Sequence, residues 1–411
     1  MDITKLLKKG ISYLPKGLKG PLIRHLVKIP SELDSEITFK IADCEAELEA
    51  SFALVYQEYL KLGYVSANTL KLRATVHHAL STTSTLVAIY QGSVVGTLTL
   101  VRDNKLGLPL ENNFSLAAIR TASKRMAEIT SMVIHTDFRR KKGGIVLFGL
   151  LKLMYLYATK CFGTSDLVIA IHPKDIDFYS ALMFFNQIPS TEVKDYYGAP
   201  AVAMSLDLKQ ATKKFLIYAD KKKEKNLHNF FLIEKHDNIH LPRRSFNTVN
   251  DPVVTYDYLK SFFIGKTKLV KLSDLNHRRH FLSFYGKLNN KIENIRLDVA
   301  APARLYVRDQ KSLLSGLVKD VSLNGFRLDC EAVMMNEAEI EIAVEVGPGK
   351  ISKLKAKAKW SIQNQTAGFE ILQMDSTWSK FIEFLMNDSK CKVEVETNSK
   401  NRLKVFPLQV S

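Results

Sequence analysis

The first half of the sequence places a carboxylate ahead of a short basic loop that contains glycine. Glu128 lies in the apolar segment AEITSMVI, which has the composition of a β-strand. The segment RRKKGG at 139–144 follows and leads directly into an apolar helix. Glycines let the backbone approach an anion, and unpaired N–H groups at the start of a helix bind phosphate. The residues predicted to bind this anion are Arg139, Arg140, Lys142, Gly143 and Gly144.

The second half contains the pattern D-x-S-x-x-G, formed by Asp320, Ser322 and Gly325. Asp and Ser side chains can bond to guanine and to the backbone of a turn, and Gly permits a tight turn between strands. Segments of alternating polarity lie on both sides of the pattern. We therefore predict a hairpin whose end presents these polar groups.

The elements that must position Glu128 and the basic loop follow a mixed order. Residues 44–62 have apolar side chains at helical spacing, and two strands beside Gln91 and Gly92 are predicted to form a hairpin. After the AEITSMVI strand come an apolar helix over 144–158, a strand over 167–171, a helix over 176–185 and a strand over 201–208. This order predicts a mixed α/β sheet.

Alternating polarity sets the second half apart. EIEIAVEVG places Ile and Val against Glu, and KLKAKAKW places apolar residues against lysines, as half-buried antiparallel strands do. Trp378, Phe381 and Leu385 then return to helical spacing, with Asp375 or Ser376 placed to cap the helix. We predict antiparallel strands followed by a C-terminal helix.

The changes in composition divide the chain into five parts. These are a basic amphipathic segment at 1–36, an α/β domain at 37–208, a helical connector or lid at 209–288, a strand-rich domain at 289–390 and a tail at 391–411. The first segment mixes leucines with lysines. It therefore either lies on an anionic membrane surface or packs on its own domain as a solvated arm.

The net charge of +17 predicts attraction to an acidic partner. Nucleic acid is not expected, because the sequence has no Cys/His finger spacing and no Arg-rich recognition helix. The four cysteines lack CxxC spacing, so neither a metal site nor a disulfide framework is indicated. The start MDITKLLKKG is not typical of a signal peptide, and the apolar run 144–158 is too short for a membrane span. We expect a cytoplasmic protein, either in solution or peripheral at the inner face of the membrane.

The stretch AEITSMVIHTDFRR…LFGLLKLMYLYA…LVIAIHPKDIDFYSALMF…GAPAVAMSLDL resembles the long-chain N-acyl amino acid synthases. These belong to the GNAT superfamily and are related to the acyl-homoserine lactone synthases. The resemblance covers about residues 40–208. It implies a GNAT-like fold and transfer of an acyl chain from acyl carrier protein, or acyl-CoA, to the amine of an amino acid, without a tightly bound cofactor. An acidic carrier protein would suit the positive charge of the chain.

The resemblance also implies roles for single residues. Glu128 matches the acidic residue of the lactone synthases' E-L-S-R segment and is the expected base. The alternative is an edge carboxylate paired with Arg125 or Arg120. Tyr179 either protonates the leaving thiolate or belongs to the core. His172 either binds substrate or relays a proton near neutral pH, or it shapes the turn after its strand. Arg73 is a candidate for binding the acceptor carboxylate.

The segment NKIENIRLDVAAPARLYV…GLVKDVSLNGFRLDC…KLKAKAKWSI…TAGFEIL resembles PilZ domains, which implies a six-stranded barrel and a cyclic di-GMP site. The implied ligands are Lys291, Arg296, Asp320, Ser322 and Gly325. Of the family's R-x-x-x-R arm only the second arginine is present, since Ile292 takes the first position. The domain therefore either binds cyclic di-GMP or serves as a protein-docking or structural domain.

Together these features predict an N-acyltransferase that makes N-acyl amino acids and is regulated through its PilZ-like part. Two other readings stay open. One is a non-catalytic receptor for cyclic di-GMP that uses the GNAT fold as a binding platform. The other is an enzyme that acylates an amine on a protein.

Overall fold

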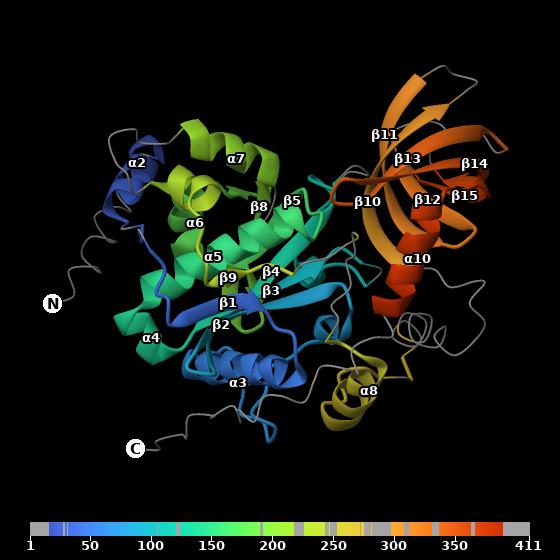
Figure 1. Cartoon of the computed structure of the whole chain (residues 1–411). Helices are drawn as coiled ribbons and strands as arrows, with labels where there is room; N and C mark the ends of the chain where they lie inside the picture. Colours follow the sequence, from blue (N-terminus) through green and yellow to red (C-terminus); the bar gives the residue numbers. More distant parts are fainter. Residues whose placement is uncertain are drawn as a thin grey trace.

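The computed structural model shows a mixed α/β domain followed by a β-barrel (Figure 1). The residues that it describes are 16–27, 29–30, 32–104, 106–120, 124–189, 192–217, 226–242, 246, 253–271, 273–274, 281, 297–307, 312–330, 337–362 and 366–388. Within them, the strands form one nine-stranded sheet and one closed barrel. The expected fold class is confirmed.

The sheet has the order β6-β8-β5-β4-β3-β2-β1-β9, and β7 pairs with β8. Most neighbours are antiparallel, but β4 and β5 are parallel, as are β1 and β9. The strands are β1 (Ile37–Ile41), β2 (Thr83–Tyr90), β3 (Ser93–Arg102), β4 (Met126–Ile134), β5 (Asp166–Ile171), β6 (Asn186–Gln187), β7 (Lys194–Tyr196), β8 (Ala199–Asp207) and β9 (Ile239–His240).

Helices cover both faces of this sheet: α5 (Gly143–Lys160) lies on one face and α3 (Glu45–Lys61) on the other (Figure 1). The almost continuous apolar sequence of α5 follows from its burial, since it packs in the main core against β1, β2 and β3. Gly149 allows close approach to β1, because a Cβ there would lie 2.2 Å from the Phe39 ring. The apolar run is thus a core helix. In the described part of the chain, no helix is both long and apolar enough to cross a bilayer.

The expected connector at 209–288 is largely packed onto the α/β domain where the structure describes it. It contains α7 (Leu208–Ile217), a π-helical turn (Asn229–Ile233), α8 (Tyr256–Tyr258) and a second π-helical segment (Leu259–Lys266). Phe230 and Phe231 join the main core, and Lys152 Nζ of α5 donates hydrogen bonds to the carbonyls of Phe230 and Glu234. The ammonium of Lys152 therefore holds the carboxyl end of the π-helical turn.

The described part of the N-terminal segment forms α2 (Lys16–Leu26), which packs on α6 (Ile176–Leu182). Lys19 Nζ lies 3.1 Å from an oxygen of Asp177, and Arg24 donates to the carbonyl of Ala181 at 3.0 Å. The alternatives for segment 1–36 were contact with an anionic membrane and packing on its own domain, and α2 packs on its own domain. Residues 1–15 lie outside the described residues.

The second domain is a closed antiparallel barrel with the strand order β10-β11-β12-β15-β14-β13. Its strands are β10 (Leu297–Val307), β11 (Ser312–Ser322), β12 (Gly325–Cys330), β13 (Glu339–Gly347), β14 (Lys350–Ile362) and β15 (Thr366–Gln373). The helix α10 (Ser376–Asp388) inserts Trp378 and Phe381 into the barrel core. Asp375 caps this helix, because its carboxylate accepts the N–H of Trp378 at 2.9 Å.

Candidate active site

The two central parallel strands of the sheet pair over only part of their length. Met126–Ile129 of β4 pair with Asp166–Ile169 of β5, and no further pairs follow. One extra residue bulges from β4 against β3, and Ser131 there has a φ of 52°. A cavity of about 580 Å³ opens where β4 and β5 separate, lined by the carboxyl-terminal parts of both strands. This opening is the candidate active site.

Glu128 lies on β4 behind the wall of the cavity and is fully buried. Its Oε2 accepts the N–H of Leu110 at 2.7 Å, and its Oε1 accepts the Tyr196 hydroxyl at 2.8 Å. Of the two arginines proposed as alternative partners, Arg120 pairs instead with Asp103 and Glu111. The other, Arg125, is influenced by the charge of Asp166 and not by that of Glu128. Burial raises the pKa of Glu128 to about 8, although the two hydrogen bonds favour the ionised form. A carboxyl group with this pKa can exchange protons with amines near neutral pH.

Two tyrosines that the sequence reasoning missed flank this carboxylate. They are Tyr196 and Tyr197, at the turn between β7 and β8, where Tyr197 has a φ of 53° and Gly198 a φ of 82°. Both tyrosines line the cavity. The dipeptide Tyr-Gly between two strands indicates a tight hairpin, which was the available signal. Contact of Tyr196 with Glu128, however, depends on the tertiary fold.

Arg73 lines the same cavity, with its guanidinium carbon 4.8 Å from the centroid of the Tyr197 ring. Its Nη1 donates to the carbonyl of Ala74 at 3.0 Å. Among the residues that the structure describes, no carboxylate lies within ion-pair distance of Arg73. The structure therefore places Arg73 in the cavity wall and Glu128 behind that wall, and each contacts one of the adjacent residues Tyr197 and Tyr196.

The basic segment 139–144 is not the simple loop that we expected. It begins in a short helix, α4 (Thr136–Lys141), and α5 starts at Gly143. The helix α4 forms because its first turn is anchored by Glu58 of α3, which accepts the hydroxyl and the N–H of Thr136. Tertiary contacts thus replace the predicted loop by a helix.

The predicted anion ligands are divided by this arrangement. Arg139 Nη2 lies 2.7 Å from Glu58, and Lys142 Nζ lies 2.5 Å from Asp34. Arg140 is exposed. Gly144 lines the cavity in the first turn of α5, where N–H groups have no partner within the helix, and a Cβ there would meet open space. Of the predicted anion ligands, Arg139 and Gly144 line the cavity, although the guanidinium of Arg139 is paired with Glu58. The anion-binding roles of Arg140, Lys142 and Gly143 stay predictions.

His172 and Tyr179 also border the cavity, on the β5 side. The Nδ1 of His172 accepts the N–H of Lys174 at 3.2 Å, so this ring caps the 3-10 turn Pro173–Asp175. The Tyr179 ring packs in the main core beside Phe185, and burial raises the pKa of its hydroxyl. Both residues therefore have structural roles, while their predicted chemical roles stay predictions.

The D-x-S-x-x-G pattern forms the predicted tight turn, between β11 and β12. Ser322 Oγ donates to the carbonyl of Gly325 at 3.1 Å, and the Asp320 carboxylate pairs with Arg327 at 2.7 Å. The other two predicted ligands, Lys291 and Arg296, lie outside the described residues.

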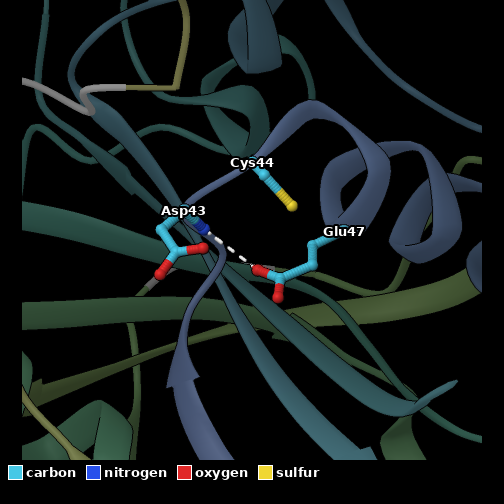
Figure 2. A group of neighbouring side chains, drawn as sticks. All are labelled: Asp43, Cys44 and Glu47. Atoms are coloured by element: carbon cyan, nitrogen blue, oxygen red, sulfur yellow. Dashed lines mark hydrogen bonds between the residues drawn. The ribbon is translucent and has the colours of Figure 1, made fainter. Parts of the chain in front are cut away.

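A separate acidic group lies at the start of α3, formed by Asp43, Cys44 and Glu47 (Figure 2). Their potential ligand atoms lie within 4.8 Å of one another. However, the ammonium of Lys40 lies 2.8 Å from Asp43 and 2.9 Å from Glu47. Because this cation already balances both carboxylates, the group gives no reason to place a metal there.

Known proteins match either the α/β domain or the barrel. A family model described as N-acyl amino acid synthase FeeM matches residues 50–207. The structure of FeeM from uncultured soil microbes is 24% identical, covering 44% of this chain and 96% of that chain with a TM-score of 0.37. The CoA-dependent acyl-homoserine lactone synthase BjaI, solved with SAM and isopentyl-CoA, is 14% identical, covering 51% of this chain and 95% of that chain with a TM-score of 0.39.

The barrel has a separate relative. The PilZ domain of CeSA from a cellulose-synthesizing bacterium is 15% identical, covering 24% of this chain and 100% of that chain with a TM-score of 0.20. No curated protein sequence matches the chain. The residues that match the N-acyl amino acid synthase family model, 50–207, include β4, β5 and the cavity between them.

Proposed function

We propose that the α/β domain transfers a long-chain acyl group from a carrier thioester to the α-amine of an amino acid. The observation that carries this proposal is that a buried carboxylate and an arginine contact two adjacent tyrosines that line one cavity. Glu128 reaches the cavity through Tyr196, and Arg73 lies over Tyr197. An amino acid needs both functions, since its amine must lose a proton and its carboxylate must be held.

The reaction uses these groups in order. Arg73 binds the acceptor carboxylate, because its guanidinium faces no carboxylate of the described residues and can form a bidentate contact. The amine attacks the thioester carbonyl and loses a proton toward Glu128. The amide product and a free thiol leave. Exclusion of water around Glu128 keeps its pKa close to that of an amine, which favours proton transfer in both directions.

The proposed donor is acyl carrier protein, with acyl-CoA as the alternative. Both donors carry phosphate, which suits the first turn of α5 beside Gly144. The exposed Arg140 lies just before this turn, and the net charge of +17 favours an acidic carrier over a small cofactor. The two donors differ in salt dependence, because a carrier protein presents many more charges.

The test uses the full-length protein with acyl carrier protein or CoA charged with acyl chains of several lengths, and a mixture of amino acids. Mass spectrometry of the products should detect N-acyl amino acids with the wild type and a large loss with Glu128→Gln. Failure of the wild type to form product from any donor would contradict the proposal and favour a non-catalytic receptor. Mass shifts on added proteins, without small-molecule products, would favour protein acylation.

We further propose that the barrel regulates this domain and that cyclic di-GMP is its effector. Lys319 precedes Asp320 and is the extra residue of a β-bulge in β11. Burial lowers the pKa of Lys319, and the charges of Arg102 and Asp103, at the end of β3, also act on it. Asp103 pairs with Arg120, and Arg120 pairs with Glu111 beside the Leu110 N–H that binds Glu128. The charge interaction between Lys319 and Asp103, followed by these ion pairs, supports a route from the barrel to the base.

Titration calorimetry with cyclic di-GMP on the wild type and on Arg296→Ala tests the effector. We expect binding by the wild type and weaker binding by the variant, with a change in acyl transfer at saturating nucleotide. Binding without any effect on transfer would leave the barrel as a separate receptor. Absence of binding would leave it as a docking or structural domain. Association of segment 1–36 with anionic membranes also stays a proposal, testable by flotation with anionic vesicles.

A further inference from the structure

Tyr196 is the link between the buried carboxylate and the cavity. Within the function proposed above, we infer that the Tyr196 hydroxyl is a catalytic proton relay: it takes the proton from the attacking amine while passing its own proton to Glu128. The sequence indicated His172 as a possible proton relay and did not indicate Tyr196.

The position of Glu128 requires such a link. Its side chain is fully buried and does not line the cavity. One oxygen accepts the N–H of Leu110 and the other accepts the Tyr196 hydroxyl. Tyr196 does line the cavity. An amine bound in the cavity can therefore reach the carboxylate through the tyrosine oxygen, which has a lone pair free for a second hydrogen bond.

The β7–β8 turn fixes the orientation of this tyrosine. Asp195 Oδ1 accepts the N–H of Gly198 at 3.2 Å, and Asn113 Nδ2 donates to the Asp195 carbonyl at 2.8 Å. The turn also lies against Tyr64, since a Cβ on Gly198 would come 3.1 Å from the Tyr64 carbonyl oxygen. The left-handed conformation of Tyr197 directs that ring to Arg73. One turn thus supplies a proton path and a support for the arginine, both from adjacent residues.

The transfer balances in atoms and protons. The amine nitrogen attacks the carbonyl carbon and a C–N bond forms. A proton moves from this nitrogen to Tyr196 Oη while the Tyr196 proton moves to Glu128 Oε1. When the C–S bond breaks, the thiolate leaves with the electron pair, and Glu128 returns a proton through Tyr196 to the sulfur. The net change is one thioester and one amine converted to one amide and one thiol.

The electrostatic surroundings agree with this role. Burial and the negative charge of Glu111 raise the pKa of Glu128, the hydrogen bonds from Leu110 and Tyr196 lower it, and the resulting pKa is about 8. The pKa of Tyr196 is raised by burial and by the charge of Glu128, so the hydroxyl keeps its proton at rest and gives it to Glu128 only as it receives one from the amine. Tyr197 and Tyr59 are the other titratable groups acting on Tyr196.

The deciding experiment compares full-length wild type, Tyr196→Phe and a matched control, Tyr155→Phe, in the acyl transfer assay. The control loses a buried hydroxyl that bonds Thr212, far from the cavity walls. We expect Tyr196→Phe to lower kcat by roughly 100-fold with little change in the acceptor KM. The acid limb of its pH profile should move to higher pH, because Glu128 loses a hydrogen bond that lowers its pKa.

A double mutant tests the same path without relying on one variant. If Glu128 and Tyr196 act in series, Glu128→Gln with Tyr196→Phe should be no slower than the worse single mutant. If the fold-losses in kcat of the two single mutants multiply in the double mutant, Glu128 and Tyr196 act independently and the relay is wrong. A Tyr196→Phe enzyme with wild-type kcat, or one with a raised KM alone, would also overturn the relay. An inactive wild type would instead remove the proposed function and the relay together, while unfolding would be seen in thermal melts of each variant.

Discussion

Arg139 of α4 lies 2.7 Å from the carboxylate of Glu58 on α3, and Glu58 is almost completely buried. Burial alone would raise the pKa of Glu58, but hydrogen bonds from Lys61 and Thr136 and the charge of Arg139 outweigh it and lower that pKa. The guanidinium of Arg139 is therefore engaged in holding α4 against α3. Its neighbour Arg140 remains exposed.

We accordingly predict opposite phenotypes for the two arginines. Arg139→Ala should lower the free energy of unfolding by about 1–2 kcal/mol, since a buried carboxylate loses one of its partners. Arg140→Ala should leave stability nearly unchanged and raise the KM for the acyl donor several-fold. Urea unfolding and initial rates at varied donor concentration check both. A larger rise in the donor KM for Arg139→Ala than for Arg140→Ala would mean that Arg139 binds the donor phosphate.

Glu128 should destabilise the folded protein at neutral pH. Its pKa is about 8 in the folded state and near 4.5 when unfolded, so the folded state binds more protons between these values. Its contribution to stability is therefore fully present below about pH 4.5 and is lost as pH rises toward 8. Glu128→Gln should raise the free energy of unfolding at pH 7 by about 2–3 kcal/mol.

Urea unfolding of wild type and Glu128→Gln at pH 5 and pH 8 checks this linkage. The difference between the two proteins should grow with pH. An equal difference at both pH values would mean that Glu128 is ionised throughout, and the proton-transfer scheme would lose its electrostatic support.

Arg73 should control acceptor recognition. Arg73→Ala should raise the KM for amino acids by about 10- to 100-fold, the loss expected for a charge-assisted hydrogen bond. An amine without a carboxylate should be used equally well by both enzymes, because it makes no contact with the guanidinium. Steady-state kinetics with an amino acid and its decarboxylated amine make the comparison. Equal losses for both acceptors would assign Arg73 to the fold of the cavity.

Two glycines of α5 offer a matched pair. Gly149→Ala would place a Cβ 2.2 Å from the Phe39 ring, so we expect destabilisation of about 1–3 kcal/mol from overpacking. Gly144→Ala meets open space and should leave stability intact, yet it narrows the approach of an anion to the start of the helix. Thermal melts and donor KM values separate the two effects. A stable Gly149→Ala protein would show that β1 can move away from α5.

Lys319 should transmit the state of the barrel. Lys319→Ala should retain the affinity for cyclic di-GMP but lose the nucleotide's effect on acyl transfer, because it removes the ammonium on which the charges of Arg102 and Asp103 act. Lys380→Ala, an exposed lysine on α10, is the control and should behave as wild type. Regulation that persists in Lys319→Ala would place the coupling elsewhere in the chain.

Local sequence patterns predicted the framework well. In β13 and β14, apolar and polar residues alternate because one face of each strand is buried and the other exposed. This alternation predicts both strands from consecutive residues alone. The D-x-S-x-x-G turn and the apolar helix α5 are local in the same sense. These features need no knowledge of distant contacts.

The contacts that shape the cavity are distant in sequence. The helix α4 depends on Glu58, which lies far earlier in the chain, and so a basic segment that resembles a loop becomes helical. Likewise, Tyr196 meets Glu128 only because β7 and β4 belong to one folded sheet. Hydrophobic periodicity carries no information on either contact.

The turn residue Tyr197 has a further consequence, for how this protein would evolve. A left-handed backbone suits Gly or Asn better than an aromatic residue, so either replacement should relieve local strain. Variants selected only for heat resistance should therefore drift away from tyrosine at 197. Variants selected for turnover should keep it, because the ring lies under Arg73. Deep mutational libraries sorted by these two criteria would then diverge at a single position of the hairpin.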